Sequence, residues 1–332
     1  MPRKPTRREI GRGERVLPGV WRLRLPLPWP GVPHCNAWAL AAGDGVVLVD
    51  TGMHDAASMA HLERALDQVG LRIEHVRLVV ITHAHVDHCG QAPPIAERAG
   101  CEVWIHPAHG HYTRSLADPE QALARRAEVA RTSGVPEQDL RRWLESRRGQ
   151  GTGQAGTLRS DRDLVDGVTV ATDLGDWQVI ETPGHAPSHI CLHQPERRLL
   201  ISGDHLLGRI SLFFDVGYTP DPVDEFLRSL DRVDALDVRL SLAGHGRPFT
   251  DAAGHIAGNR TLVGDRLDAV RGVLAEGPVT AWDLAGRLHG DAFGAATATW
   301  LLQESLAWLT HLERRGEATP SHEGETETWS AA

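Results

Sequence analysis

The stretch that decides the fold is Thr82-His83-Ala84-His85-Val86-Asp87-His88, which directly follows an apolar run at residues 76–81. The apolar run predicts a buried strand that ends in a loop with three imidazoles and one carboxylate. Side chains at i and i+2 of an extended chain point the same way, so His83 and His85 can bind one metal ion. Asp87 and His88 follow where the chain turns, and they can face a second ion beside the first. These ligand types suit Zn²⁺ and also Fe, Mn or Co.

Three further polar residues stand where predicted strands end. They occur in Thr182-Pro183-Gly184-His185, in Ser202-Gly203-Asp204 and in Ala243-Gly244-His245-Gly246. Loops beyond strand ends are where sites assemble in layered α/β proteins, and glycines beside them let the backbone approach closely. His185, Asp204 and His245 are therefore candidate metal ligands as well.

The elements predicted around these motifs alternate between strand and helix, which favours a layered α/β fold. Two predicted helices, 121–132 and 137–148, interrupt the alternation. A helical region begins near residue 251 and leads, past Gly277-Pro278, into a segment of different composition. We therefore predict a disordered basic arm at 1–15, a catalytic domain at 16–250 with a helical insert at about 110–160, a helical linker and small domain at 251–317, and a disordered tail at 318–332.

Composition sets limits on the class of protein. The 332 residues carry 35 basic and 44 acidic side chains, a formal net charge of −9, which disfavours a protein built mainly to bind polyanions. An apolar content of 41% excludes wholesale disorder. The four cysteines are scattered and do not suggest a disulfide framework. The sequence contains no uncharged apolar run of about 18 residues, so we do not expect a membrane span. We expect a cytoplasmic protein with reduced thiols.

Together these motifs resemble the metallo-β-lactamase-fold hydrolase superfamily, over about residues 16–250. The resemblance implies a four-layer αβ/βα sandwich with two metal ions at one edge. It implies that His83, His85 and His185 bind one ion and that Asp87, His88 and His245 bind the other. It further implies that Asp204 bridges the ions and that Asp50, at another strand end, orients a ligand by hydrogen bonding.

This ligand set predicts a hydrolase. Two divalent ions, of which Zn²⁺ fits best and Fe or Mn also fit, lower the pKa of a shared water and supply a metal-bound hydroxide. Asp87 is also a candidate proton acceptor, so we assign catalytic roles to Asp87 and Asp50. The best-known zinc β-lactamases have a cysteine where this chain has Asp204. The bridging aspartate instead resembles the glyoxalase-II-like branch, and we expect a small ester-type substrate, a thioester or lactone.

The sequence offers fewer signals for substrate binding. Phe213, Phe214 and Tyr218 follow Asp204 closely and are either walls of an acyl pocket or core aromatics. Arg141 and Arg142 lie in the insert, which is either a lid that binds an anionic part of a small-molecule substrate or a solvated helix face.

The region at about 270–317 resembles the winged-helix module appended to some of these hydrolases. One interpretation is a nucleic-acid-binding module, which keeps open a metal-dependent endoribonuclease or phosphodiesterase, or a DNA-binding ligand sensor. The other is a satellite that packs on the core or forms a homodimer interface, because its last helix is mostly apolar. A mononuclear iron oxidoreductase resembling persulfide dioxygenases is a further alternative on the same ligand frame.

Overall fold

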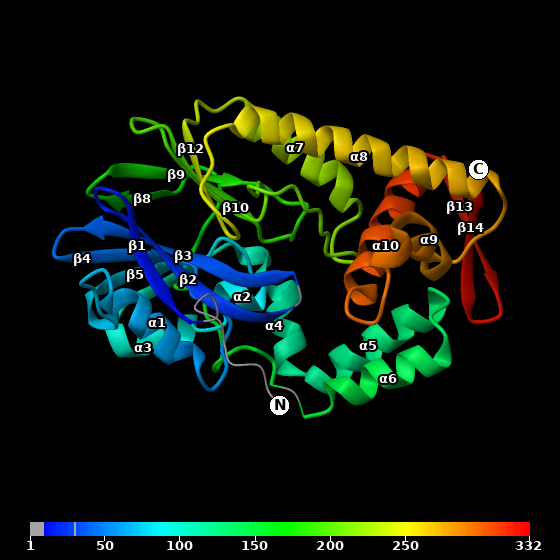
Figure 1. Ribbon diagram of the computed structural model, residues 1–332, viewed down its shortest axis with the longest axis horizontal. Coiled ribbons are helices and arrows are strands. Elements are labelled where there is room, and N and C mark those ends of the chain that lie inside the picture. Colours follow the sequence, from blue (N-terminus) through cyan, green and yellow to red (C-terminus); the bar gives the residue numbers. More distant parts are fainter. Residues whose placement is uncertain (1–9, 30, 150) are drawn as a thin grey trace.

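Figure 1 shows a computed structural model that describes residues 10–29, 31–149 and 151–332. Two β-sheets face each other, and helices cover both outer faces. The apolar cluster between the sheets includes Trp38 and Trp177, which are both fully buried. The predicted four-layer αβ/βα sandwich is therefore confirmed.

The first sheet has seven strands in the order β1-β2-β3-β4-β5-β6-β7. Its first four strands form an antiparallel meander, and β4 to β7 run parallel to one another. Short apolar runs such as Val-Arg-Leu-Val-Val in β5 suit strands that are buried inside a layered fold. The strands are β1 Arg12–Leu17, β2 Val20–Trp29, β3 Val32–Ala42, β4 Gly45–Val49, β5 Val76–Val80, β6 Glu102–Ile105 and β7 Arg162–Asp163.

The second sheet has five strands in the order β12-β11-β10-β9-β8. Since β9 and β11 both pair antiparallel to β10, and β12 pairs parallel to β11, the strands β9, β11 and β12 run in one direction. Their ends meet at one edge of the sandwich. The strands are β8 Thr169–Thr172, β9 Gly175–Glu181, β10 Ile190–Gln194, β11 Leu199–Gly203 and β12 Leu240–Ala243.

Amphipathic helices form the two outer layers. In α1, Leu62 and Leu66 are buried against the first sheet, in one cluster with Ile95 of α3. Helix α7 buries Phe226 and Leu230 against the second sheet, beside α8. The helices of these layers are α1 Ser58–Asp67, α3 Ala92–Ala99, α7 Pro222–Asp234 and α8 Ala252–Ala275, and the short α2 Val86–Cys89 begins inside the histidine motif.

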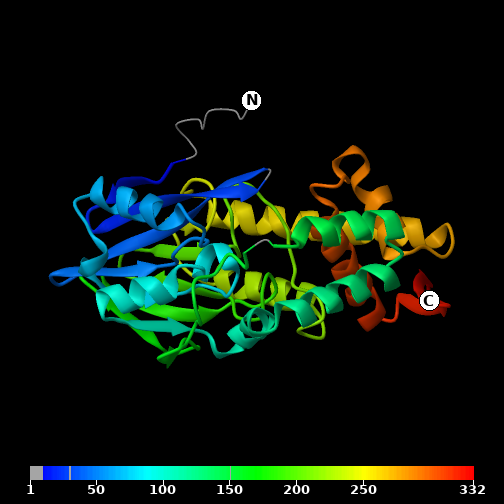
Figure 2. The same ribbon diagram turned by 90° about the horizontal axis from the view of Figure 1, so that it is seen from below.

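The insert and the C-terminal elements lie side by side at one end of the molecule (Figures 1 and 2). The backbone N–H of Trp282 donates to the carbonyl oxygen of Ser133, 3.0 Å away, which ties the two together. The C-terminal elements share one apolar cluster with α7, in which Trp308 is fully buried. The insert comprises α4 Gly110–Ala117, α5 Pro119–Thr132 and α6 Glu137–Arg147, and the C-terminal part has α9 Ala281–His289, α10 Ala298–Arg314, β13 Ala318–Glu323 and β14 Thr326–Ala331.

The predicted disordered tail at 318–332 is wrong, because β13 and β14 form an antiparallel hairpin. Trp329, which is 5% exposed, packs in the C-terminal cluster, and its backbone pairs with Val279. One buried tryptophan and this pairing order a segment whose other side chains are mostly polar. Helices followed by a hairpin fit a winged helix, but that assignment and the domain boundary near residue 250 stay predictions.

The predicted disordered arm at 1–15 is also partly wrong. Residues 1–9 lie outside the described residues, but β1 pairs with β2 from Arg12 onward. Backbone hydrogen bonds to β2 order this segment, and its charged side chains gave no indication of them. In the described part of the chain, no helix combines the length and apolar character needed to cross a membrane.

Candidate metal centre

Five strand ends deliver the polar residues to one edge of the sandwich. Asp50 directly follows β4, and the histidine motif follows β5. From the second sheet come the loops after β9, β11 and β12, which carry His185, Asp204 and His245. The chain turns into α2 at Val86, so Asp87 and His88 lie in the first turn of that helix. The structure thus brings together all seven ligands that the sequence predicts.

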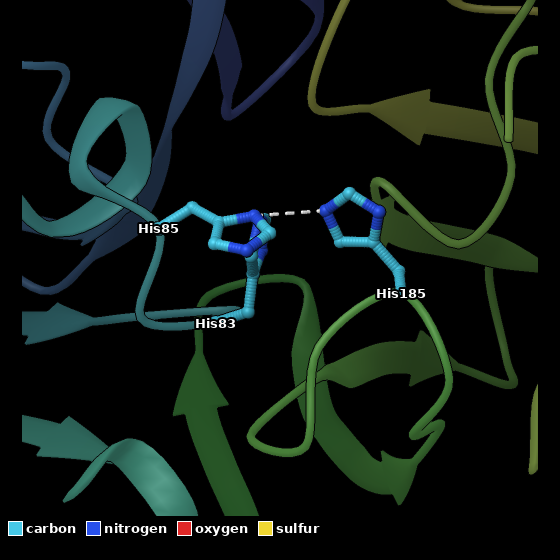
Figure 3. Close-up of side chains that lie close together, drawn as sticks. All are labelled: His83, His85 and His185. Atoms are coloured by element: carbon cyan, nitrogen blue, oxygen red, sulfur yellow. Dashed lines mark hydrogen bonds between the residues drawn. The ribbon is translucent and has the colours of Figure 1, made fainter. Parts of the chain in front are cut away.

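One group of three imidazoles, His83, His85 and His185, forms what we call the histidine site. One ring nitrogen from each lies within 4.8 Å of the others. Figure 3 shows these rings turned toward one another, with His85 Nδ1 3.0 Å from His185 Nε2. Three converging nitrogens match the donor set of a protein-bound divalent transition metal.

A second group, Asp87, His88 and His245, forms what we call the carboxylate site. Asp87 Oδ2 lies 3.3 Å from His245 Nε2 and 3.6 Å from His88 Nε2. Asp204 stands between the two sites. Its carboxylate oxygens lie 3.1 Å from His245 Nε2, 3.5 Å from His88 Nε2 and 3.7 Å from His185 Nε2.

Each of the five imidazoles is held in place by a hydrogen bond of its outer ring nitrogen, the one that points away from the centre. Such hydrogen bonds select the tautomer that leaves a lone pair on the inner nitrogen. The outer contacts are His83 Nδ1 to Thr82 Oγ1 at 3.0 Å, His85 Nε2 to Asp215 Oδ2 at 2.8 Å, His88 Nδ1 to Asp50 Oδ2 at 2.8 Å, His185 Nδ1 to the Phe213 carbonyl at 3.1 Å and His245 Nδ1 to the His34 carbonyl at 2.9 Å.

Asp50 is the buried acceptor that organises two ligands. Besides the bond from His88, it accepts hydrogen bonds from the Thr82 backbone N–H at 2.8 Å and from the Thr82 hydroxyl at 2.9 Å. Because that hydroxyl donates to Asp50, its oxygen is left to accept from His83 Nδ1. Asp50 therefore touches His88 directly and positions His83 through Thr82.

The centre fits a divalent metal. His83 Nε2, His88 Nε2 and Asp204 Oδ1 are buried and have no hydrogen-bond partner among the described residues. Buried polar atoms of this kind are costly unless a ligand satisfies them. Gly244 keeps the backbone close, because a Cβ there would collide with Asp204 Oδ1 and lie 2.8 Å from His88 Cε1. Inward lone pairs, orphaned acceptors and a site that excludes a Cβ all point to metal binding.

The two sites differ in charge. Burial, with a contribution from His85, lowers the pKa of His185 to about 4, and burial also holds the pKa of His83 well below its usual value. In the carboxylate site, burial is outweighed by Asp204 and Asp87, which raise the pKa of His245 to about 10. The same carboxylates raise the pKa of His88 well above its usual value. In the histidine site His85 is the exception, because the charge of Asp215 and its hydrogen bond outweigh burial and raise the pKa of His85. In the absence of metal, the carboxylate site retains protons on both of its imidazoles at neutral pH.

Sequence reasoning missed Asp215, which lies in the loop between β11 and α7. Its carboxylate accepts from His85 Nε2, and His111 Nε2 of α4 lies 3.2 Å from the same oxygen. Burial raises the pKa of Asp215, but His85 and His111 outweigh it and hold that pKa far below its usual range. No spacing rule marks a carboxylate eleven positions beyond Asp204, so no sequence signal could have found it.

The predicted substrate-binding residues fall into different places. The Phe213 ring lies beside the metal centre, 5.6 Å between centroids from both His85 and His185. Phe214 is fully buried between Phe226 and Trp308, which favours the core aromatic among the two alternatives that the sequence left open. Tyr218 is 49% exposed and lies 5.3 Å, ring to ring, from His111. Arg141 and Arg142 are exposed and pair with Glu137 and Asp139 of their own helix.

Comparisons with known proteins find relatives in sequence and in fold. The family model of the metallo-beta-lactamase superfamily matches residues 30–245. Probable metallo-hydrolase YqjP of Bacillus subtilis is 26% identical over 320 residues, which cover 92% of this chain and 96% of that protein. A metallo-beta-lactamase family protein from Thermus thermophilus has a TM-score of 0.81 at 28% identity and covers 96% of this chain and 100% of its own. A beta-lactamase domain protein from Burkholderia ambifaria has a TM-score of 0.77 at 30% identity, with coverages of 96% and 95%.

Proposed function

The chain belongs to the metallo-beta-lactamase superfamily and is a metallo-hydrolase, and on this premise we propose that it uses two divalent ions to hydrolyse a small ester-type substrate. The substrate class that we propose is a thioester or a lactone. The ions that we propose are Zn²⁺, with Fe and Mn as the alternatives to be tested.

A single observation carries the dinuclear proposal, namely the position of Asp204. Among the seven ligands, it is the residue whose carboxylate oxygens approach imidazoles of both sites, His185 on one side and His88 and His245 on the other. A carboxylate can donate one oxygen to each of two neighbouring ions. Two separate three-residue groups on either side of it supply the remaining donors.

Divalent ions at such a site supply Lewis-acid activation of a water molecule and of the substrate carbonyl. The protein's own residues hold the donor atoms in place, because the outer nitrogen of every imidazole makes a hydrogen bond to a neighbouring residue. Asp87 is the residue whose carboxylate we propose to receive a proton during hydrolysis. The Phe213 ring, beside the histidine site, forms an apolar wall against which an acyl group can lie.

The charge of the C-terminal part favours a small substrate over a nucleic acid. Residues 251–332 contain six arginines against twelve carboxylates. Its last helix, α10, buries Leu302, Trp308 and Leu312 in the core. A module that reads nucleic acid needs an exposed basic face, and these features oppose one.

The proposal is tested by assaying the metal-loaded protein against four substrates, namely an acyl thioester, an acyl lactone, a structured RNA and a glutathione persulfide. We expect metal-dependent hydrolysis of the thioester or the lactone. Cleavage of RNA alone would instead establish a nuclease. Oxygen consumption with the persulfide would establish an iron oxidoreductase, and either result would contradict the proposal.

A further inference from the structure

An open hollow of about 460 Å³ on the surface, which we call the cavity, lies outside the metal centre, where β1 and β2 approach the loop that follows β12. Its lining is strongly basic, although the whole chain has a formal net charge of −9. The charged residues that line it are Arg12, Glu14, Arg15, Arg22, Arg24 and Arg247.

Most of this positive charge has no partner within the described part of the chain. Glu14 forms an ion pair with Arg22. Among the described residues, no ion pair or side-chain hydrogen bond is formed by Arg12, Arg15, Arg24 or Arg247. Residues 1–9 add only one carboxylate against four basic side chains, so the sequence there offers little acid to neutralise the cavity.

The strand register brings like charges together. Arg12 of β1 stands directly opposite Arg24 of β2, and Glu14 stands opposite Arg22. Like charges at directly opposed positions destabilise a sheet. An arrangement that places Arg12 and Arg24 across from each other is thus unfavourable unless an anion lies between or above them.

Two guanidinium groups are also partly withdrawn from water. Arg22 is 4% exposed, and the Nε atoms of Arg22 and Arg24 are buried without a hydrogen-bond partner among the described residues. Burial lowers the pKa of Arg22; Glu14 opposes that shift, whereas Arg24 and Arg247 add to it. A buried, unsatisfied N–H donor next to further arginines is suited to bind an oxyanion.

We propose that this cavity binds a small, soluble phosphate-bearing anion. Guanidinium groups match phosphate oxygens in geometry as well as charge, and the hollow is large enough to receive a small anion. The anion would lie close to the metal centre without belonging to it. Arg22 Nη1 donates to the carbonyl oxygen of Gly246 at 2.9 Å, and Gly246 is the residue after the ligand His245.

Calorimetric titration of the metal-loaded protein with pyrophosphate tests this site. We expect saturable binding that the double variant Arg24→Gln/Arg247→Gln weakens by at least about tenfold. Arg15→Gln, on an exposed part of β1, should weaken it by a smaller factor and guards against a folding defect in the double variant. The matched control is Arg228→Gln, which removes an exposed arginine of α7 and should leave binding unchanged.

Three results would overturn the proposal. The first is failure of pyrophosphate to bind the wild-type protein, and the second is equal binding by all variants, as expected of an anion held only by the metal ions. The third is that the wild-type protein does not bind pyrophosphate but co-sediments with vesicles of phosphatidylcholine and phosphatidylserine in equal amounts, and that the double variant no longer co-sediments. That outcome would assign the arginines to a membrane surface. None of these results depends on the substrate of the hydrolase.

Discussion

The two halves of the metal centre are built from different donors. The histidine site has three imidazole donors, and burial keeps the pKa values of His83 and His185 low. The carboxylate site replaces one imidazole by Asp87, and the carboxylates around it raise the pKa values of His88 and His245.

This difference determines the protonation state of each half in the metal-free protein. At neutral pH the carboxylate site holds protons on imidazoles that must become ligands, whereas two of the three imidazoles of the histidine site are already neutral. Metal must therefore displace more protons from the carboxylate site than from the histidine site. The two ions should therefore bind with unequal affinity.

The largest effect is expected from breaking the histidine site. His85→Ala removes a donor whose Nδ1 faces His185, and we expect kcat/KM to fall by about a thousandfold or more. His322→Ala is the matched control, since His322 is exposed on β13 and should give wild-type rates. Steady-state kinetics on the preferred substrate measures both, and near-normal turnover of His85→Ala would contradict the assignment.

Removing the link between the halves should cost somewhat less. Asp204→Asn keeps the shape of the side chain but removes the negative charge that faces His245 and His88, so we expect loss of one ion and about a hundredfold lower kcat/KM. Asp237→Asn alters an exposed carboxylate that pairs with Arg198 and serves as control. Retention of two tightly bound ions in Asp204→Asn would show that this residue does not join the sites.

A substitution of Asp215 should change the metal affinity of the histidine site alone. Among the described residues, Asp215 contacts His85 of that site and no residue of the carboxylate site. Asp215→Asn should lower the affinity of the histidine site by about 10–100-fold, since such partners orient a ligand and raise its basicity. Competition with a chromogenic chelator measures the two affinities separately. An equal loss at both sites would indicate a general structural role instead.

The mildest perturbation is acidification. Below its pKa of about 10, His245 in the metal-free protein holds a proton that metal must displace, so the affinity of the carboxylate site should fall as the pH falls. His185, with a pKa of about 4, stays neutral through the same range. Equilibrium dialysis between about pH 8 and pH 6 should therefore remove the ion of the carboxylate site first. Simultaneous release, or release from the histidine site first, would contradict the electrostatic difference.

Much of the fold and most of the ligand set could be predicted because their signals are local. The histidine motif is seven residues long and follows an obvious buried strand, and His185, Asp204 and His245 each follow another. Contacts that depend on tertiary structure could not be predicted. Asp215 faces His85 only after the β11–α7 loop folds back, and Phe214 differs from its neighbour Phe213 only in the direction that the loop gives it.

The C-terminal hairpin illustrates the same limit. Its sequence is polar and lacks an apolar alternation that would predict strands. What orders it is Trp329, whose side chain enters the core and whose backbone pairs with Val279, far earlier in the chain. Composition indicates a disordered segment, whereas a single long-range contact makes it a hairpin.

Metal stoichiometry tests the central claim most directly. Elemental analysis of the purified protein, after removal of loosely bound metal, should give two divalent ions per chain. His85→Ala and His245→Ala should each retain one, in the carboxylate site and the histidine site respectively. One ion per wild-type chain, or loss of all metal from both variants, would contradict an account in which two unequal sites are joined by Asp204.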